Sequence, residues 1–556
     1  MHTVRQQAAF AKQHGLFKAA SALNVTSNLF HLMLDLTQKP SSTSGSLYDS
    51  LPNVSRVDFF ISHSWSCPSW IKTLAFCHFL NLDLAIASSF LACLVAIFVL
   101  VLHTGSLSGV AQLQQGTLYA SLLCWPMAVF LVAYLCGHAA VGRTSFWFDR
   151  ICVDQSNSSV KAQTLQAIPA FVAESTQMLV LWDDSYFERL WCNYELSVHA
   201  KTAESPRAMQ LVPMWISLWT LSWISLYTIL NFLCIGQKAP PLDLDSRRSL
   251  FSSMVGSNFV PSYVYLLTAF PFSWFCIQKL KSHKLMLDQM ANFDLRNAKC
   301  SVESDRKVIE EQVLQLFDEA LEPPMRIAFI AGEAPMAQLD RLDGEVNEDA
   351  PLVSHVSRET IEEIRHITSY PTKDEVINQF NTYVRGPLRD SVMNSMWKED
   401  YISFKLCILV SLPWWFQGLI LVLGCDGRHC DRSAAYGGYR SVPEYMVTNA
   451  AMKLLLAPLV NALSYPVMLK TNHLVSQMAE GMVSQMLLGS ACSAVAVFLL
   501  DHIGLYLCGI LMVVVNKYSH VWLAEFVAGL TLLFWATWFL FRKSLPQSQR
   551  SLSHHT

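Results

Sequence analysis

The chain has 556 residues, of which 52% are hydrophobic and only 15% are charged, and its mean hydropathy is +0.30. Soluble globular chains carry about 25% charged residues, so this composition excludes a purely soluble protein. The net charge of −3 comes with no basic stripe, which excludes a nucleic-acid-binding surface. Sixteen Trp and 31 Phe fit aromatic side chains at a membrane interface. Together these features predict an α-helical multi-pass membrane protein.

Residues 1–56 predict an N-terminal helix followed by a linker. Val4 to Leu34 carry apolar side chains at helical spacing, whereas Thr37–Arg56 is rich in Ser, Thr and Pro. The helix is expected to pack on a cytosolic domain rather than to lie on a membrane surface. No apolar stretch with a cleavage site precedes the first span, so that span is expected to be an uncleaved anchor.

Strand and helix signals then alternate along two parts of the chain, residues 57–83 and 138–210. The segments are Val57–Trp65, Pro68–Leu80, Ser145–Gln155, Val160–Ser175, Gln177–Tyr186 and Phe187–Thr202, strand first. This alternation of strands and helices is typical of a doubly wound parallel sheet. Ligands of such sheets bind beyond the carboxyl ends of the strands, which is where the stretches HSW, FDR and DDSY fall.

Eight apolar stretches have the roughly 20 residues that a bilayer crossing needs. They are Leu84–His103, Thr117–Gly137, Leu211–Gly236, Phe259–Gln278, Phe404–Gly424, Met446–Leu469, Gln485–Val515 and Val521–Phe541. The first two form a hairpin, 84–137, inserted into the α/β domain; a pair follows in 211–278 and four spans lie in 404–541. Seven or nine spans are the alternative counts.

Lys and Arg are distributed unevenly between the segments outside these spans. The eight spans divide the rest of the chain into nine segments, numbered from the N-terminus. The odd-numbered segments hold 31 of these basic residues and the even-numbered segments hold 7. Since cytoplasmic segments carry the excess of basic residues, both termini, the α/β domain, residues 279–403 and the tail 542–556 are expected in the cytoplasm. The sequence does not indicate which membrane holds the protein.

Two apolar runs are candidates for the last strands of the α/β domain. Gln210–Trp215 runs directly into the third span, and Ile327–Pro335 lies far along the chain in region 279–403. That region otherwise predicts helices, such as Val308–Leu321 and Glu359–Thr368, around an acidic stretch at 332–351. If Ile327–Pro335 is a strand of the α/β domain, that domain is discontinuous in the sequence.

Three motifs, in this order, resemble the TIR (Toll/interleukin-1 receptor) domain family: FISHSW, FWFDR, and the stretch from Ser175 to RLWCNYEL. The family pattern is Phe-x-Ser, an acidic second strand end, then Ser-x-Tyr leading to Trp-Cys-x-x-Glu-Leu; here Ser185 and Tyr186 are adjacent. The match covers 57–65 and 145–202, about an eighth of the chain. The resemblance implies a flavodoxin-like sheet and a signalling module that acts through TIR–TIR self-association or adaptor proteins. The alternative function is NAD hydrolysis with no required cofactor.

The resemblance places Glu195 at the position of the catalytic carboxylate. A carboxylate there can stabilise the oxocarbenium-like ribose as nicotinamide leaves; a solvated or capping role is the alternative. The residues expected to edge the substrate cleft are Ser64, Trp65, Asp149, Ser185, Tyr186 and Trp191. Strand-end turns and core packing are the competing explanations for these six residues.

Cys425 and Cys430 lie in a loop expected on the non-cytoplasmic side, where a disulfide can form. The single His between them does not have a zinc-site spacing, so no metal site is expected.

Four ionisable residues fall within the spans: Lys453, Asp501, His502 and Glu525. Such residues are candidates for an ion or proton path, which makes a transporter or channel embedded in membrane lipid a second alternative function. Structural polar pairs are the competing explanation, and no inverted repeat supports transport.

Overall fold

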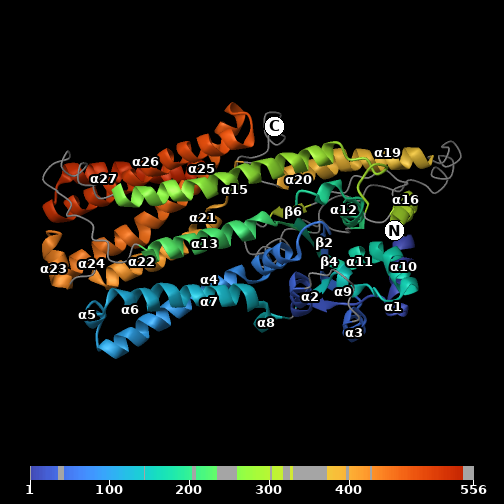
Figure 1. The fold of residues 1–556 in the computed structure, drawn as a ribbon, viewed down its shortest axis with the longest axis horizontal. Helices are drawn as coiled ribbons and strands as arrows, with labels where there is room; N and C mark the ends of the chain where they lie inside the picture. Colours follow the sequence, from blue (N-terminus) through green and yellow to red (C-terminus); the bar gives the residue numbers. More distant parts are fainter. Residues whose placement is uncertain are drawn as a thin grey trace, which may run out of the picture. The chain divides into compact units, whose positions relative to one another are not determined.

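The computed structural model describes residues 2–34, 43–142, 144–202, 208–233, 259–300, 303–316, 326–329, 372–395, 400–425 and 429–541. It is mostly helical with one small sheet (Figure 1). The contacts divide the chain into two compact units. The sheet unit comprises Met1–Phe76, Gly142–Met214 and Leu285–Met396, and the helical unit comprises Cys77–Val141, Trp215–Lys284 and Trp397–Thr556.

The sheet has six described strands in the order β1-β3-β2-β4-β5-β6. They are β1 (Ala20–Ser21), β2 (Val57–His63), β3 (Ser145–Trp147), β4 (Ser175–Trp182), β5 (Ala208–Pro213) and β6 (Arg326–Phe329). Strands β2 to β6 pair in parallel, and β1 pairs antiparallel with β3. Counted along the chain, the parallel strands have the order 2-1-3-4-5, which is that of flavodoxin-like doubly wound sheets. The central β4 is buried along nearly its whole length, as parallel strands covered on both faces are.

Both late strands lie near the expected places, with different bounds. β5 ends at Pro213 and the next helix begins at Trp215, so the predicted span Leu211–Gly236 starts too early. Leu211 and Val212 are buried in the sheet, where both pair with β4 and Leu211 also pairs with β6. The strand β6 occupies the start of the run Ile327–Pro335, whose residues 330–335 lie outside the described part. The sheet unit is therefore assembled from three separate segments of the chain.

The sheet unit surrounds its strands with short helices. They are α1 (His2–Gln13), α2 (Ala22–Leu34), α3 (Thr43–Ser50), α9 (Asp149–Cys152), α10 (Ser158–Gln166), α11 (Ile168–Ala173), the 3-10 turn η2 (Tyr186–Glu188), α12 (Leu190–Thr202), α16 (Glu303–Leu316), α19 (Lys373–Tyr383), the π-helical η3 (Val384–Leu388) and α20 (Arg389–Ser395). The expected helix Glu359–Thr368 lies outside the described residues.

The predicted N-terminal helix, Val4–Leu34, is in fact two helices separated by β1. Gly15, with φ +63°, turns the chain after α1, and β1 then covers the free edge of β3 by antiparallel pairing. The expected linker Thr37–Arg56 also contains a helix, α3.

The helical unit is built from longer elements, which Figure 1 draws as a bundle of roughly aligned helices. They are α4 (Ser69–Thr104, which begins in the sheet unit), α5 (Leu107–Val110), α6 (Gln115–Tyr119), η1 (Ala120–Cys124), α7 (Trp125–Cys136), α8 (His138–Val141), α13 (Trp215–Leu233), α15 (Phe259–Ala291), α21 (Phe404–Val410), α22 (Leu412–Leu423), α23 (Cys430–Tyr436), α24 (Val442–Ala450), η5 (Ala451–Leu456), α25 (Ala457–Met478), α26 (Met482–Lys517) and α27 (His520–Phe541).

Five helical runs in the described part of the chain are long and apolar enough to cross a membrane. They are Ser69–Thr104, Gln115–Cys136, Val442–Met478, Met482–Lys517 and His520–Phe541. The pair α21 and α22, bent by 51° at its break, makes a sixth if it counts as one span. By their length and composition, these helices fit a multi-pass membrane protein. The count of eight remains a prediction, because α13 and α15 are not among these runs.

Candidate functional site

The candidate site lies at the carboxyl ends of β2, β3 and β4. β2 is hydrogen-bonded to β3 on one side and to β4 on the other. In this strand order the first and third parallel strands flank the point where ligands of doubly wound sheets bind. The loops that follow these strands bring Ser64, Asp149 and Ser185 to this edge, as the sequence predicts.

Glu195 accepts a hydrogen bond at this edge from Ser62, whose hydroxyl is in turn hydrogen-bonded to Tyr186. Ser62, the serine of β2, donates a hydrogen bond from Oγ to Glu195 Oε2 at 2.5 Å. The Tyr186 hydroxyl lies 2.6 Å from Ser62 Oγ and is fully buried. Because the Ser62 proton points to the carboxyl group, the Tyr186 hydroxyl supplies the other proton. The sequence reasoning overlooked Ser62, although it is the serine of the Phe-x-Ser motif.

The carboxyl group of Glu195 is perturbed by its surroundings. Burial raises the pKa of Glu195 to about 8, the hydrogen bond from Ser62 opposes this rise, and the charge of Asp149 adds to it. A carboxyl group whose ionisation falls near neutral pH, at a ligand-binding edge, is a candidate for catalysis. Taken as a whole residue, Glu195 is partly exposed.

Three serine hydroxyls tie the loop after β2 to the loop after β4. Ser64 Oγ lies 2.7 Å from Ser185 Oγ, and Ser66 Oγ lies within 2.7 Å of both. Arg189 donates to Ser66 Oγ at 2.9 Å, and Ser185 donates from its backbone and its side chain to Asp183. This network fixes two walls of the site, and its members Ser66 and Arg189 were not predicted.

Trp65 presents an exposed aromatic face beside the carboxyl group of Asp149. Its indole Nε1 donates to Asp149 Oδ2 at 2.9 Å, and 54% of the residue is exposed. The Arg150 guanidinium lies 5.5 Å from the ring centroid, a cation–π distance. Burial raises the pKa of Asp149, and the hydrogen bond from Trp65 is the largest opposing effect. An indole held in this way can stack on a planar ring of a ligand.

Lys72 adds a buried positive charge that the sequence reasoning missed. It lies in the first turns of α4 and is only 5% exposed. Burial lowers the pKa of Lys72, while the nearby charges of Asp149 and Asp183 raise it. His63 is buried beside them, and burial lowers its pKa well below the usual range, so its imidazole is neutral. A buried ammonium group here suits an anionic group such as a phosphate.

Trp191 lies on α12 with Glu195 but has a different partner. Its indole Nε1 donates to Asp305 Oδ2 of α16 at 3.3 Å. Cys192, the next residue, is buried and donates to the carbonyl of His63. Of the seven residues predicted for the substrate site, the structure thus gathers six around the strand ends, and Trp191 joins α12 to α16.

The described residues contain no group of three or more His, Cys, Asp or Glu side chains that could hold a metal ion. The four ionisable residues that the sequence predicts within spans lie in the helical unit: Lys453 in η5, Asp501 and His502 in α26, and Glu525 in α27. His502 Nδ1 lies 2.7 Å from the carbonyl of Phe498, one turn earlier in its own helix. Asp501 lines a cavity of about 60 Å³ between α22, α25 and α26.

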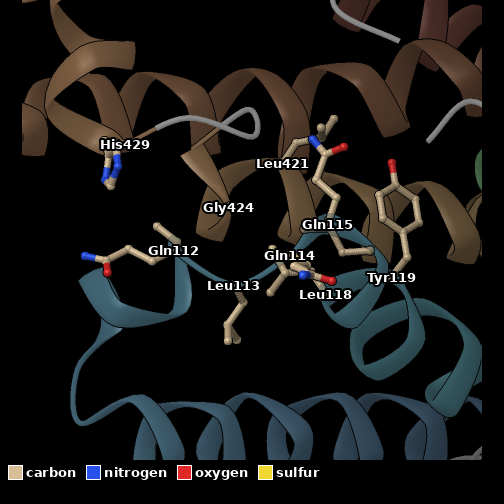
Figure 2. Close-up of a pocket in the computed structure, with 11 residues that line it drawn as sticks. Gln112, Leu113, Gln114, Gln115, Leu118, Tyr119, Leu421, Gly424 and His429 are labelled. Atoms are coloured by element: carbon tan, nitrogen blue, oxygen red, sulfur yellow. The ribbon is translucent and has the colours of Figure 1, made fainter. Parts of the chain in front are cut away.

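A larger cavity, of about 290 Å³, lies in the helical unit beside the cysteine loop (Figure 2). Its polar lining is uncharged, consisting of Gln112, Gln114 and Gln115 with Tyr119, and His429 borders it. Figure 2 shows Gln112 facing His429 and Gln115 beside Tyr119. His429 directly precedes Cys430, so the bond that closes the loop also positions this wall.

Cys425 and Cys430 form a disulfide with a Cα–Cα distance of 5.1 Å. We expect mass spectrometry of the denatured, unreduced protein to show two fewer alkylated cysteines than the reduced protein. The double variant C425S/C430S is the control, because its alkylation should not depend on reduction. Full alkylation of both thiols without a reductant would contradict the bridge and the oxidising side assigned to the loop.

Comparisons of the chain with protein-family models, with curated proteins and with solved structures find no match.

Proposed function

We propose that the chain is a membrane-anchored, TIR-like signalling protein whose sheet unit releases nicotinamide from NAD at Glu195. The observation that carries this proposal is the contact of Glu195 with Ser62, at the strand edge where a sheet of this order binds ligands. The order of the TIR-like motifs and the flavodoxin-like strand order support it independently. A perturbed carboxyl group at such an edge favours chemistry over packing alone.

The proposed reaction breaks the bond between ribose C1′ and the pyridinium nitrogen, and the electron pair stays with nicotinamide. Nicotinamide leaves as a neutral molecule, so positive charge develops on the ribose and no acid is needed for the leaving group. The ionised carboxylate of Glu195 stabilises that charge. Water then forms the new bond to C1′ and loses a proton to solvent, and the products are nicotinamide and ADP-ribose.

The surrounding groups have supporting roles in this proposal. Ser62 orients the carboxyl group of Glu195 through its 2.5 Å hydrogen bond. The exposed face of Trp65 stacks on an aromatic ring of the substrate. Lys72 and Arg150, whose charges both act on Asp149, balance the negative charge of the pyrophosphate.

A protein-interaction module without catalysis is the competing function, and one experiment separates the two. Purified full-length protein in detergent or nanodiscs is incubated with NAD, and nicotinamide is quantified by chromatography. Release that depends on Glu195 supports the enzyme. No release, either from dilute protein or from protein concentrated to drive self-association, would leave the adaptor function and reject catalysis.

The orientation in the membrane is a separate prediction. The chain carries Asn-x-Ser/Thr acceptors at Asn24, Asn53 and Asn157, all in segments proposed to be cytoplasmic. Since glycosyl transfer to such sites occurs on secreted segments, we expect no mobility shift on deglycosylation of protein expressed in eukaryotic cells. A control with an acceptor site inserted between Gly105 and Ser106, in the loop proposed to be outside, should shift.

A glycan on Asn157 would contradict this orientation. Asn157 caps α10 within the sheet unit, accepting hydrogen bonds from the backbone of Ser159 and Val160. Glycosylation there would put the whole sheet unit on the side where cytosolic NAD and adaptors are absent, and the proposed function would fail with the topology.

A further inference from the structure

The larger cavity of the helical unit lies where three of its segments meet. The loop 111–114 and α6 supply one part of its lining, the end of α22 supplies another, and His429, just before α23, borders it (Figure 2). Its volume of about 290 Å³ is close to the lower end of ligand pockets, about 300 Å³. Since liquid water occupies about 30 Å³ per molecule, the cavity has room for a ligand of roughly ten non-hydrogen atoms.

The walls of this cavity are held in place by contacts outside it. The disulfide between Cys425 and Cys430 fixes the backbone next to His429, and Ser433 Oγ donates a hydrogen bond to the Cys425 carbonyl at 2.7 Å. Ala111, in the loop that carries the glutamines, packs against the same buried cluster as Cys425. Two walls from distant parts of the chain therefore share one support. A site that is ordered in advance loses less conformational entropy when a ligand binds.

The close approach of α22 to α6 depends on a glycine. A Cβ atom at Gly424 would lie 2.9 Å from Leu118 Cδ1 and 2.8 Å from the carbonyl oxygen of Ile420. Any side chain at this position would therefore displace Leu118, which lines the cavity. The glycine lets the end of α22 and α6 form adjoining walls.

The lining combines uncharged hydrogen-bonding groups with apolar side chains. Gln112, Gln114 and Gln115 each carry an amide that both donates and accepts hydrogen bonds, and Tyr119 and His429 add further polar groups. The apolar side chains in the lining are those of Ala111, Leu113, Leu118, Ile420 and Leu421. Among the residues that the structure describes, no Asp, Glu, Lys or Arg lines the cavity. Because a charge removed from water needs a partner, this lining favours an uncharged ligand.

The polar groups of the lining are spread over different segments rather than gathered at one point. Gln112 faces His429, and Gln115 lies beside Tyr119 (Figure 2). A ligand with a single amide or hydroxyl group would meet only one of these places, and an acyl chain would leave all the amides without a hydrogen bond. The hydroxyl groups of a sugar are spaced around a ring and each donates and accepts, while its C–H groups suit the apolar side chains.

We propose that this cavity binds a neutral sugar of the size of one hexose. A hexose has about a dozen non-hydrogen atoms, which matches the space available. The lining loops fall in segments 104–116 and 425–445, whose few basic residues predict the non-cytoplasmic side of the membrane. The ligand would then come from outside the cytoplasm. This binding function is independent of the proposed chemistry at Glu195.

The test measures sugar binding to the purified full-length protein in nanodiscs, which avoids the sugar headgroups of maltoside and glucoside detergents. Glucose, galactose and mannose are titrated one at a time, saturation-transfer NMR gives each Kd, and empty nanodiscs are the blank. We expect at least one hexose to bind with a Kd in the millimolar range or below. Q115L should weaken this binding at least tenfold, because Leu has nearly the size of Gln but offers no hydrogen bond.

Q477L is the matched control for this substitution. Gln477 is an exposed residue of α25 outside the cavity lining, so its replacement should leave the Kd unchanged. Q112L provides a second test within the cavity and should also weaken binding, and gel filtration reports the folding of each variant.

A charged analogue tests the chemical class of the ligand. The uronate of the hexose that binds has a carboxylate in place of the C6 hydroxymethyl group, and it should bind at least tenfold more weakly than that hexose. Binding of none of the three hexoses, a Kd unchanged in folded Q112L and Q115L, or a uronate that binds as tightly as its hexose would overturn the proposal. NAD is absent from the assay, so a negative result says nothing about the sheet unit.

Discussion

Replacing Glu195 with Ala or Gln is expected to lower kcat for nicotinamide release by about 10²–10³-fold, the usual cost of removing one group that stabilises charge in a transition state. Gln has nearly the same shape as Glu, and its amide oxygen can still accept the hydrogen bond from Ser62. E195Q therefore removes the negative charge and leaves the packing of α12 in place. KM for NAD should change much less than kcat, because the charge on ribose develops only in the transition state.

Glu174 provides a matched control for this substitution. It precedes β4 at the opposite edge of the same sheet, where it forms an ion pair with Lys12 at 3.1 Å. E174Q should therefore leave kcat unchanged, apart from a small loss of stability of less than about 1 kcal/mol, as expected for an exposed pair. Full activity in a folded E195Q would remove Glu195 from the mechanism, and equal losses in both variants would indicate a general effect on folding.

The convergence of Ser64, Asp149 and Ser185 could be predicted from the sequence, because a simple rule governs it. Each follows a strand of one parallel sheet, and the carboxyl ends of such strands share an edge. The position of Lys72 does not follow from any such rule. The carboxylate charges that act on it include those of Asp149 and Asp183, which belong to distant segments of the chain. Within its own helix Lys72 has no pattern that marks it as buried.

The errors in the predicted fold also have specific causes. The turn after α1 depends on Gly15 in a left-handed conformation. A glycine after a helical run is a known stop signal, but the helical spacing of apolar residues continues past Gly15 and therefore predicted one continuous helix. The third span was begun too early because Leu211 and Val212 are as apolar as lipid-facing residues. A strand buried on both faces of a parallel sheet and a membrane span share this composition, and only the pairing partners distinguish them.

The pH dependence of nicotinamide release gives a test that does not rely on substitution. With the pKa of Glu195 raised by burial to about 8, about 1% of the carboxyl groups are ionised at pH 6 and about half at pH 8. Because a neutral leaving group needs no acid, the active form is the ionised one. We expect kcat to rise roughly 50-fold from pH 6 to pH 8 and to level off above pH 9, after subtraction of alkaline hydrolysis in an enzyme-free blank. A rate that falls over this range would mean that Glu195 acts as an acid.

Stability should follow the opposite trend over the same pH range, since both effects come from one ionisation. The folded state holds the proton of Glu195 more tightly than the unfolded state, where the pKa is near 4.5. The contribution of the protonated side chain to stability is therefore complete below about pH 4.5 and is lost as the pH rises through about 8. E195Q cannot ionise, so its melting temperature should match that of the wild type near pH 5 and exceed it at pH 9. If the wild type gains activity above pH 7 while it loses stability, and E195Q does neither, both effects come from the buried carboxyl group. Identical melting curves of the wild type and E195Q at pH 9 would mean that Glu195 is already ionised in the folded protein at neutral pH.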